Sequence, residues 1–197
     1  MSLYRHVRSK EELVTLMVDV ATEPPTSAED AAEGWRSGLE RWSWDLLAVV
    51  RRHPWLLQVA LPRVPFGPRR LAWLDRGLQA LADTTLNEDE KAAIILLLNG
   101  YVFSEARVAT EVGNPRQGSE AQSAATEQLE VLSALVDRQR FPALRRALDA
   151  GIFDPPGAGR DADFAFGLER FLDGVERLVT ERADERQPPP GAAREGD

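Results

Sequence analysis

The sequence has no cysteine and only two histidines among its 197 residues. Without a thiol, a disulfide, a thiolate metal site and a cysteine nucleophile are all excluded. The two histidines, His6 and His53, are far apart in the chain and give little support to a metal site. No unbroken apolar run reaches the roughly 18 residues of a membrane span, and the N-terminus lacks the apolar core of a secretory signal. We therefore expect a cytoplasmic protein with no membrane contact, no metal and no other cofactor.

Positive charge is scarce over most of the chain. The net charge is −8, whereas a surface that grips nucleic acid needs clustered lysine and arginine side chains to neutralise phosphates. The first ten residues are the exception, because they carry Arg5, Arg8 and Lys10 and no acid. Any contact with DNA is therefore expected from this end. Catalysis also receives little support, since no side chain that could act as a nucleophile has a distinctive local setting.

Alternation of apolar and polar residues with a period of two is also lacking, whereas apolar residues recur at helical spacing through most of the chain. An apolar content of 43% is enough to bury a substantial core. The sequence therefore predicts an all-α fold of about seven or eight helices. We expect helices at about residues 10–23, 27–53, 69–82, 88–112, 121–138, 142–150 and 162–183.

Three short segments carry the signals of helix N-termini. Ser9-Lys10-Glu11-Glu12 is a capping box, in which the Ser9 hydroxyl and the Glu12 carboxylate each accept a backbone N–H of the other residue. Ser27 is followed by two acidic residues, and Asn87 by three, at positions where the helix dipole favours negative charge. We expect helices to begin at these three points.

Proline and glycine mark where the helices end. Pro54 lacks an amide hydrogen and disfavours helical geometry at His53, so the second helix is expected to stop there. Residues 62–68 contain three prolines and one glycine, which predicts a loop. Residues 184–197 are rich in proline, glycine and charge and cannot bury enough surface to fold, so we expect a disordered tail.

The segment Ser2-Leu3-Tyr4-Arg5-His6-Val7, with Lys10 after it, resembles the end of the DNA-binding domain in the tetracycline repressor (TetR) family of bacterial regulators. In that family a Leu-Tyr-x-His-Val segment ends the recognition helix, and a nearby lysine begins the helix that links the DNA-binding domain to the regulatory domain. The family's first two helices would precede Ser2. The resemblance implies that residues 1–8 are the remnant of a DNA-recognition helix, that residues 9–23 form the linking helix, and that the DNA-binding positions are Ser2, Leu3, Tyr4, His6 and Lys10.

Later segments also resemble the family's regulatory domain, namely residues 35–61, the surroundings of Asn99-Gly100-Tyr101, and residues 164–174. The resemblance implies a helical ligand-binding and dimerisation domain over residues 9–183, in a DNA-binding transcriptional repressor that responds to a small molecule. It also implies a homodimer, which the family forms through a four-helix bundle. Operator DNA is an expected partner only if the missing N-terminal helices are present. The alternative is a family relative without a DNA-binding domain, which acts by heterodimerisation or by ligand binding alone. A helical enzyme is a remote third possibility.

The family holds its ligand between helices of the regulatory domain, and the apolar stripes here favour an apolar or aromatic effector. Asn99, Val102 and Phe103 share one face of the helix from residue 88 and would set one amide among apolar groups. Aromatic residues at this spacing are also typical of a core, and His53 is more simply a packing or capping residue than a ligand contact or switch. The predicted pocket comprises Trp35, Leu39, Trp42, Leu46, Trp55, Phe66, Leu74, Asn99, Val102 and Phe103.

Two glycines lie seven residues apart on one side of the last expected helix, where missing side chains allow another backbone to approach. Because glycine costs about 1 kcal/mol relative to alanine in a helix interior, two on one face indicate a close contact. The alternative is close packing inside one subunit. We predict a dimer contact formed by Gly167, Phe171, Gly174, Val175 and Leu178.

Overall fold

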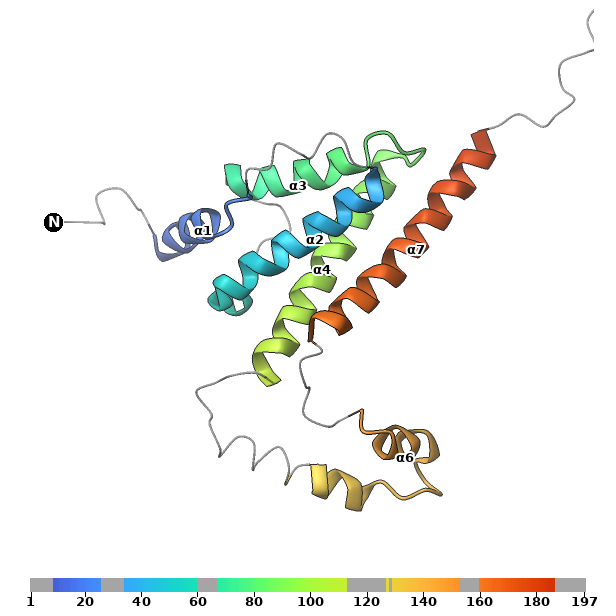
Figure 1. Ribbon diagram of the computed structural model, residues 1–197. Helices are drawn as coiled ribbons and strands as arrows, with labels where there is room; N and C mark the ends of the chain where they lie inside the picture. The colour runs from blue at the N-terminus through green and yellow to red at the C-terminus, as the bar shows by residue number, and fades with distance from the viewer. Residues whose placement is uncertain are drawn as a thin grey trace, which may run out of the picture. The chain divides into compact units, whose positions relative to one another are not determined.

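The computed structural model describes residues 9–25, 34–59, 67–112, 127, 129–152 and 160–186. All regular structure in these ranges is helical, which confirms the all-α prediction (Figure 1). Residues 129–135 are helical as well. The named elements are α1 (Lys10–Ala21), α2 (Trp35–Arg52), the 3-10 helix η2 (Pro54–Gln58), α3 (Pro68–Ala80), α4 (Glu88–Val112), α6 (Pro142–Asp149) and α7 (Arg160–Arg186).

Two of the predicted helix starts are present with their caps. At the start of α1, the Ser9 hydroxyl accepts a hydrogen bond from the backbone N–H of Glu12 at 3.1 Å. At the start of α4, Asn87 and Glu90 form a reciprocal box, because each backbone N–H donates to the side chain of the other residue, at 3.0 and 2.8 Å. The polar and acidic residues at these points therefore set the helix starts, as the sequence predicts.

Other boundaries differ from the prediction. The described part of α2 begins at Trp35 with Gly34 as its N-cap, and the start expected near Ser27 lies outside the described residues. Pro68 opens α3 instead of closing the loop before it, because the first helical position needs no backbone N–H. At the C-terminus α7 continues to Arg186, so residues 184–186 of the expected disordered tail are helical, and the rest of that tail, residues 187–197, lies outside the described residues.

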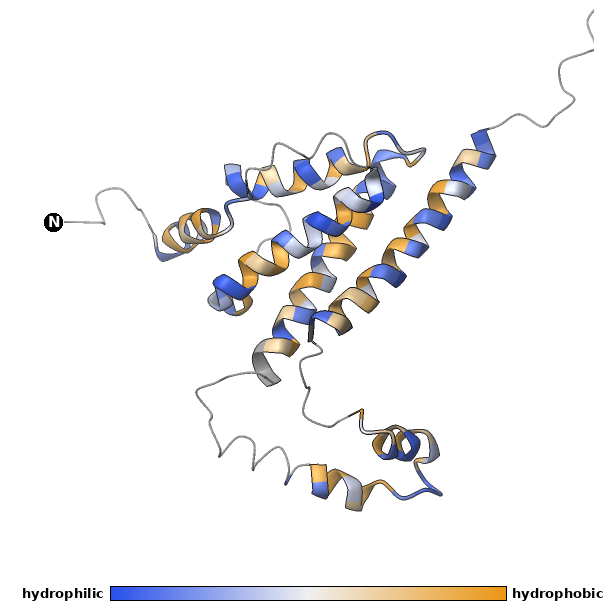
Figure 2. Ribbon diagram, viewed as in Figure 1, coloured by the Kyte–Doolittle hydropathy of each residue, from blue (hydrophilic) through white to orange (hydrophobic). Residues whose placement is uncertain are grey.

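The chain divides into two compact units, residues 1–107 with 166–197, and residues 108–165. In the first unit, α2, α3, α4 and most of α7 lie together (Figure 1), and each carries apolar positions along its length (Figure 2). Their buried side chains are aliphatic, apart from two tryptophans, Ser43 and Lys91. The run Ile94–Leu98 is helical and contributes to this core from α4. Buried side chains of this core include Leu39, Trp42, Leu46, Leu47, Val50, Leu56, Trp73, Leu81, Ile95, Leu98, Val102, Leu168 and Leu172.

In the second unit, the segment 129–135 and α6 are joined by polar contacts. The Arg145 guanidinium donates to the Ser133 carbonyl at 3.2 Å and to Asp149 at 2.7 Å. The hydrogen bond from Arg145 to Asp149, together with the charges of Arg145 and Arg138, lowers the pKa of the Asp149 carboxyl. No side chain of α6 is buried, so this unit has a smaller share of the core than the first.

Helix α4 is unusually apolar for a helix at a protein surface. By length and composition, Glu88–Ala109 would suffice to cross a membrane, with a mean hydropathy of 1.4, although buried helices of soluble proteins pass the same test. Only 28% of its most apolar stretch is buried within the chain. Helix α4 therefore presents more apolar surface than the described chain covers.

Candidate functional site

A pair of buried tryptophans lies between α2 and α3. The rings of Trp42 and Trp73 meet edge to face, with their centroids 5.7 Å apart and their planes at 83°. The Trp42 indole N–H donates to the Trp73 carbonyl at 2.9 Å, and the Trp73 indole N–H donates to the Thr22 carbonyl at the end of α1, at 2.7 Å. Each indole thus buries its ring and satisfies its one donor, and the pair links α1, α2 and α3.

A buried carboxylate forms a second link between α1 and α3. Asp19 is only 5% exposed, and its Oδ1 accepts the backbone N–H groups of Arg69 and Arg70 at 3.0 and 3.2 Å. Those amides belong to the first turn of α3, where unpaired donors and the helix dipole favour an anion. Gly67 has φ of 136°, and a Cβ there would collide with the Asp19 carboxylate. A glycine at this turn therefore permits both the backbone conformation and the close approach.

Arg76 of α3 lies over a ring of Trp73. Its guanidinium carbon lies 5.5 Å from the centroid of a Trp73 ring, and its Nη2 contacts the Asp45 carboxylate of α2 at 3.2 Å. A cation over an indole face is favourable, and more so when water is partly excluded. This contact adds a polar link between α2 and α3 to the tryptophan pair.

The predicted pocket residues fall into two groups. Leu39, Trp42, Leu46 and Val102 are buried and belong to the core. The half-buried group consists of Trp35, Trp55, Leu74, Asn99 and Phe103, and Phe66 lies outside the described residues. Asn99 and Phe103 thus flank the buried face of α4 and keep part of their surface exposed. The role of these ten residues as a ligand pocket stays a prediction.

His53 ends α2 through its backbone. Its N–H donates to the carbonyls of Val49 and Val50 at 3.0 and 3.2 Å, and Pro54 then opens η2. The structure thus gives His53 a place at the helix end that sequence reasoning favoured. Across the described residues, no group of three or more histidine, aspartate or glutamate side chains is arranged to hold a metal ion.

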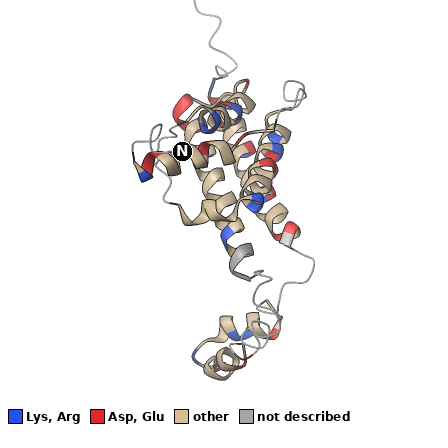
Figure 3. Ribbon diagram, turned by 90° about the vertical axis from the view of Figure 1, so that its left-hand side faces the viewer, with Lys and Arg blue, Asp and Glu red and all other residues tan. Residues whose placement is uncertain are grey.

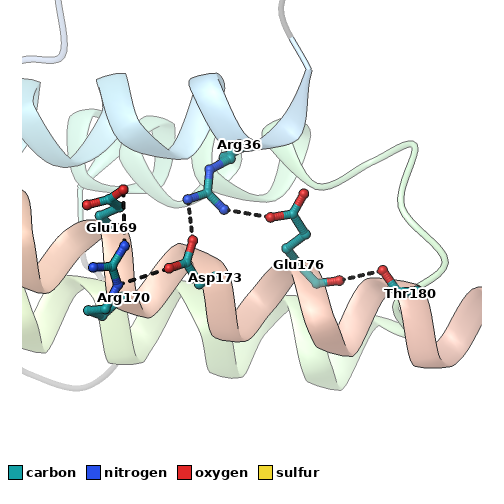
Figure 4. Close-up of polar contacts among 6 residues, drawn as sticks. All are labelled: Arg36, Glu169, Arg170, Asp173, Glu176 and Thr180. Atoms are coloured by element: carbon teal, nitrogen blue, oxygen red, sulfur yellow. Dashed lines mark hydrogen bonds and ion pairs between the residues drawn. The ribbon is translucent and has the colours of Figure 1, made fainter.

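Exposed ion pairs connect α2 to α7 (Figure 4). Arg36 Nη2 lies 2.6 Å from Asp173, and its Nη1 lies 2.9 Å from Glu176. Arg170 contacts the same Asp173 at 2.9 Å. The hydrogen bond with Asp173 raises the pKa of Arg36, while the hydrogen bond from Arg36 lowers the pKa of Asp173. The contacts hold the start of α2 beside the middle of α7, in a setting where water screens the charges.

Helices α4 and α7 are joined by a further pair. Arg182 Nε lies 2.7 Å from Glu90 Oε1, and the Thr85 hydroxyl donates to the Val179 carbonyl at 2.8 Å. Glu90 therefore serves both as the capping partner of Asn87 and as the partner of Arg182. The Asn87 backbone N–H first, and then Arg182, lower the pKa of the Glu90 carboxyl. Along the described helices, basic and acidic positions lie interspersed (Figure 3).

The glycines predicted for the dimer contact differ from each other. A Cβ on Gly167 would meet the Tyr101 ring of α4, with Cζ only 2.9 Å away, whereas a Cβ on Gly174 would meet no atom within 4 Å. Gly167 thus has a close neighbour inside its own chain, and Gly174 lies open. Val175 is buried, and Phe171 and Leu178 are half-buried. Dimer contact by these five residues stays a prediction.

Sequence reasoning passed over exposed apolar side chains on the same two helices. Leu96 and Leu97 of α4 are 56% and 63% exposed, and Phe166 of α7 is 64% exposed. The signal was present in the run Ile94–Leu98, since five consecutive apolar residues cover more than one face of a helix. One face of this run packs into the core, and Leu96 and Leu97 on the other faces stay exposed.

Comparison with known proteins gives consistent matches. The model of the tetracyclin repressor-like C-terminal domain matches residues 27–179. The HTH-type transcriptional repressor DrrR1 of Streptomyces coeruleorubidus is 35% identical over 192 residues, which cover 95% of this chain and 69% of that protein. An HTH-type transcriptional regulator of Saccharopolyspora erythraea is 26% identical over 174 residues, which cover 88% of this chain and 69% of that protein.

Solved structures share the fold. ActR of Streptomyces coelicolor in complex with actinorhodin has a TM-score of 0.63 and 24% identity, over 90% of this chain and 80% of that one. The transcriptional regulator SCO7222 of the same organism has a TM-score of 0.60 and 19% identity, over 90% of this chain and 82% of that one.

Proposed function

Because the chain belongs to the tetracycline repressor (TetR) family of ligand-responsive transcriptional regulators, we propose that it binds an apolar or aromatic effector among α2, α3 and α4. We also propose that it acts in the cytoplasm as a homodimer, and that α1 passes the effector state to operator DNA where the family's DNA-binding helices precede it. The observation that carries the effector proposal is the pair of half-buried residues Asn99 and Phe103 at the edge of the buried face of α4. One amide among apolar and aromatic groups suits a ligand that is apolar with a few polar atoms.

The effector proposal is tested by tryptophan fluorescence, with actinorhodin as the first probe because the ActR structure contains it. Saturable quenching is expected, and Asn99→Ala or Phe103→Ala should weaken binding about tenfold, through the loss of one hydrogen bond or of apolar contact. Ser104→Ala, at an exposed position of the same helix, serves as the matched control. No saturable response to actinorhodin or to other polycyclic aromatics of similar size would count against an aromatic effector.

The dimer proposal is supported by the exposed apolar side chains of α4 and α7. Leu96, Leu97 and Phe166 are all more than half exposed, and Gly174 leaves room for a close approach. Large exposed apolar side chains, where they gather into a patch, commonly mark an interface. Leu96 and Leu97 extend the predicted contact from α7 onto α4, in the manner of a bundle formed by two helices of each subunit.

Light scattering tests the dimer directly. We expect a molar mass twice that of the 21.9 kDa chain, and Leu97→Glu should lower it towards the single-chain value because a charge would be buried in the contact. Ser104→Glu, on the same helix, should leave the mass unchanged. A mass of 21.9 kDa for the unaltered chain at micromolar concentration would refute the dimer.

A further inference from the structure

Three buried contacts connect the end of α1 with α2 by way of α3. We propose that Asp19, Thr22 and Trp73 form a rigid joint, here named the α1–α3 joint, which makes α1 follow movements of Trp42 in α2. Asp19 and Trp73 are then positioning residues for the effector response. This inference rests on the proposed function, because the effector is placed beside the helix that carries Trp42.

The Asp19 contact fixes the direction of α1 relative to α3. A carboxylate loses much of its hydration when it is 5% exposed, and two backbone N–H groups and the helix dipole replace that hydration. Hydrogen bonds to adjacent amides are directional, so α1 cannot turn about α3 without uncovering a buried charge. The Arg69 guanidinium lies 3.7 Å from Oδ2 of Asp19 and adds electrostatic attraction, although its own side chain is 36% exposed.

The contact with Thr22 is made by Trp73, which also accepts a hydrogen bond from Trp42 of α2. Trp73 donates its indole N–H to Thr22 and accepts the indole N–H of Trp42 on its backbone carbonyl. Thr22 is the C-cap of α1, and its hydroxyl donates back to the Val18 carbonyl at 2.9 Å. A shift of Trp42 therefore acts on Trp73, and Trp73 acts on the last turn of α1.

The mechanical consequence is that α1 and α3 move as one body. Allosteric coupling requires an element whose arrangement both sites influence. The α1–α3 joint supplies that element, because the Trp42–Trp73 and Trp73–Thr22 hydrogen bonds are buried and the buried Asp19 side chain is held by two adjacent amides of α3. Loosening any link should free α1 while the rest of the first unit keeps its packing.

Hydrogen exchange of α1 amides, followed by mass spectrometry in the 197-residue chain, tests the joint without any effector. Trp73→Phe removes the donor to Thr22 and should speed exchange over residues 10–22 about fivefold, which corresponds to about 1 kcal/mol for one buried hydrogen bond. Trp42→Phe, which removes the α2 donor to the Trp73 carbonyl and has no direct contact with Thr22 to lose, should speed exchange in the same peptide about threefold by the same route. The double variant should show less than the product of the two effects, since both act on one chain of contacts.

Two further variants keep the test decisive. Trp44→Phe, the same change at a half-buried position of α2, should leave exchange in α1 unchanged. Asp19→Asn keeps the shape of the side chain but removes its charge, and should speed exchange in α1 even if a tryptophan variant folds poorly.

The proposal is overturned if α1 exchange is unchanged in Trp42→Phe, or if exchange rises equally in α1, α4 and α7, as general destabilisation would cause. Because no effector is added, this result is independent of the fluorescence titration. Failure of the joint and failure of the effector proposal can therefore be told apart.

Discussion

The contact between α1 and α3 and the contact between α2 and α7 both depend on a charged side chain, yet they differ in surroundings. Asp19 accepts two amides at 3.0 and 3.2 Å in a buried site. Arg36 meets Asp173 at a shorter 2.6 Å, but the two side chains are 33% and 46% exposed. The shorter contact is the weaker one, because water competes for exposed charges and salt screens them. Solvent exclusion, and not distance, decides which contact holds the fold.

The largest effect is expected when the buried carboxylate is removed. Asp19→Ala leaves the backbone N–H groups of Arg69 and Arg70 without their acceptor in a part-buried site. An unsatisfied buried donor costs about 1–3 kcal/mol, so the free energy of unfolding should fall by about 2–3 kcal/mol. Urea unfolding followed by circular dichroism measures this.

Glu23→Ala is the matched control for that variant. Glu23 lies four residues along the chain, is 68% exposed and reaches Arg69 only at 3.5 Å, so its removal should have little effect on unfolding. Equal losses for Asp19→Ala and Glu23→Ala would remove the distinction between buried and exposed contacts.

The two glycines of α7 should respond with opposite signs to the same substitution. Gly167→Ala places a Cβ against the Tyr101 ring and should destabilise the chain by about 1–2 kcal/mol, since overpacking outweighs the gain in helix propensity. In the Leu97→Glu background, where the dimer contact is expected to be lost, Gly174→Ala meets open space within the chain and should stabilise it by about 0.5–1 kcal/mol. Thermal unfolding at a fixed protein concentration tests both, and a stabilising Gly167→Ala would contradict the close packing with Tyr101.

These elements also show what the sequence could and could not predict. The starts of α1 and α4 were predictable, because a cap depends on residues three positions apart. Pro68 was predicted to end the loop of residues 62–68, but it begins α3, since proline suits both a loop and a first helical turn. The partners of Asp19 and Gly167 were not predictable, because each depends on residues about 50 or more positions away. The spacing of Gly167 and Gly174 was visible in the sequence, but not that only one of them has a close neighbour in the chain.

Removing an exposed partner should have a small effect that salt reduces further. Arg36→Ala deletes the contacts with Asp173 and Glu176 at the surface, and exposed pairs contribute little to stability. The midpoint of urea unfolding should shift only slightly in low salt, and the shift should shrink at about 0.5 M sodium chloride as the charges are screened. A loss as large as that of Asp19→Ala, and one insensitive to salt, would show that solvent does not separate the two contacts.

The smallest expected effect concerns the titration of Glu90. Its pKa is lowered in the folded chain by the Asn87 backbone N–H and then by Arg182. A carboxyl with a lowered folded-state pKa adds stability above its unfolded pKa and loses that contribution as the pH falls through the folded pKa. Arg182→Ala should therefore raise the pKa of Glu90, though not fully to its ordinary value, because the capping hydrogen bond remains. Carbon-detected NMR titration of the Glu90 carboxyl measures this shift, and an unchanged pKa in Arg182→Ala would mean that solvent already screens the ion pair completely.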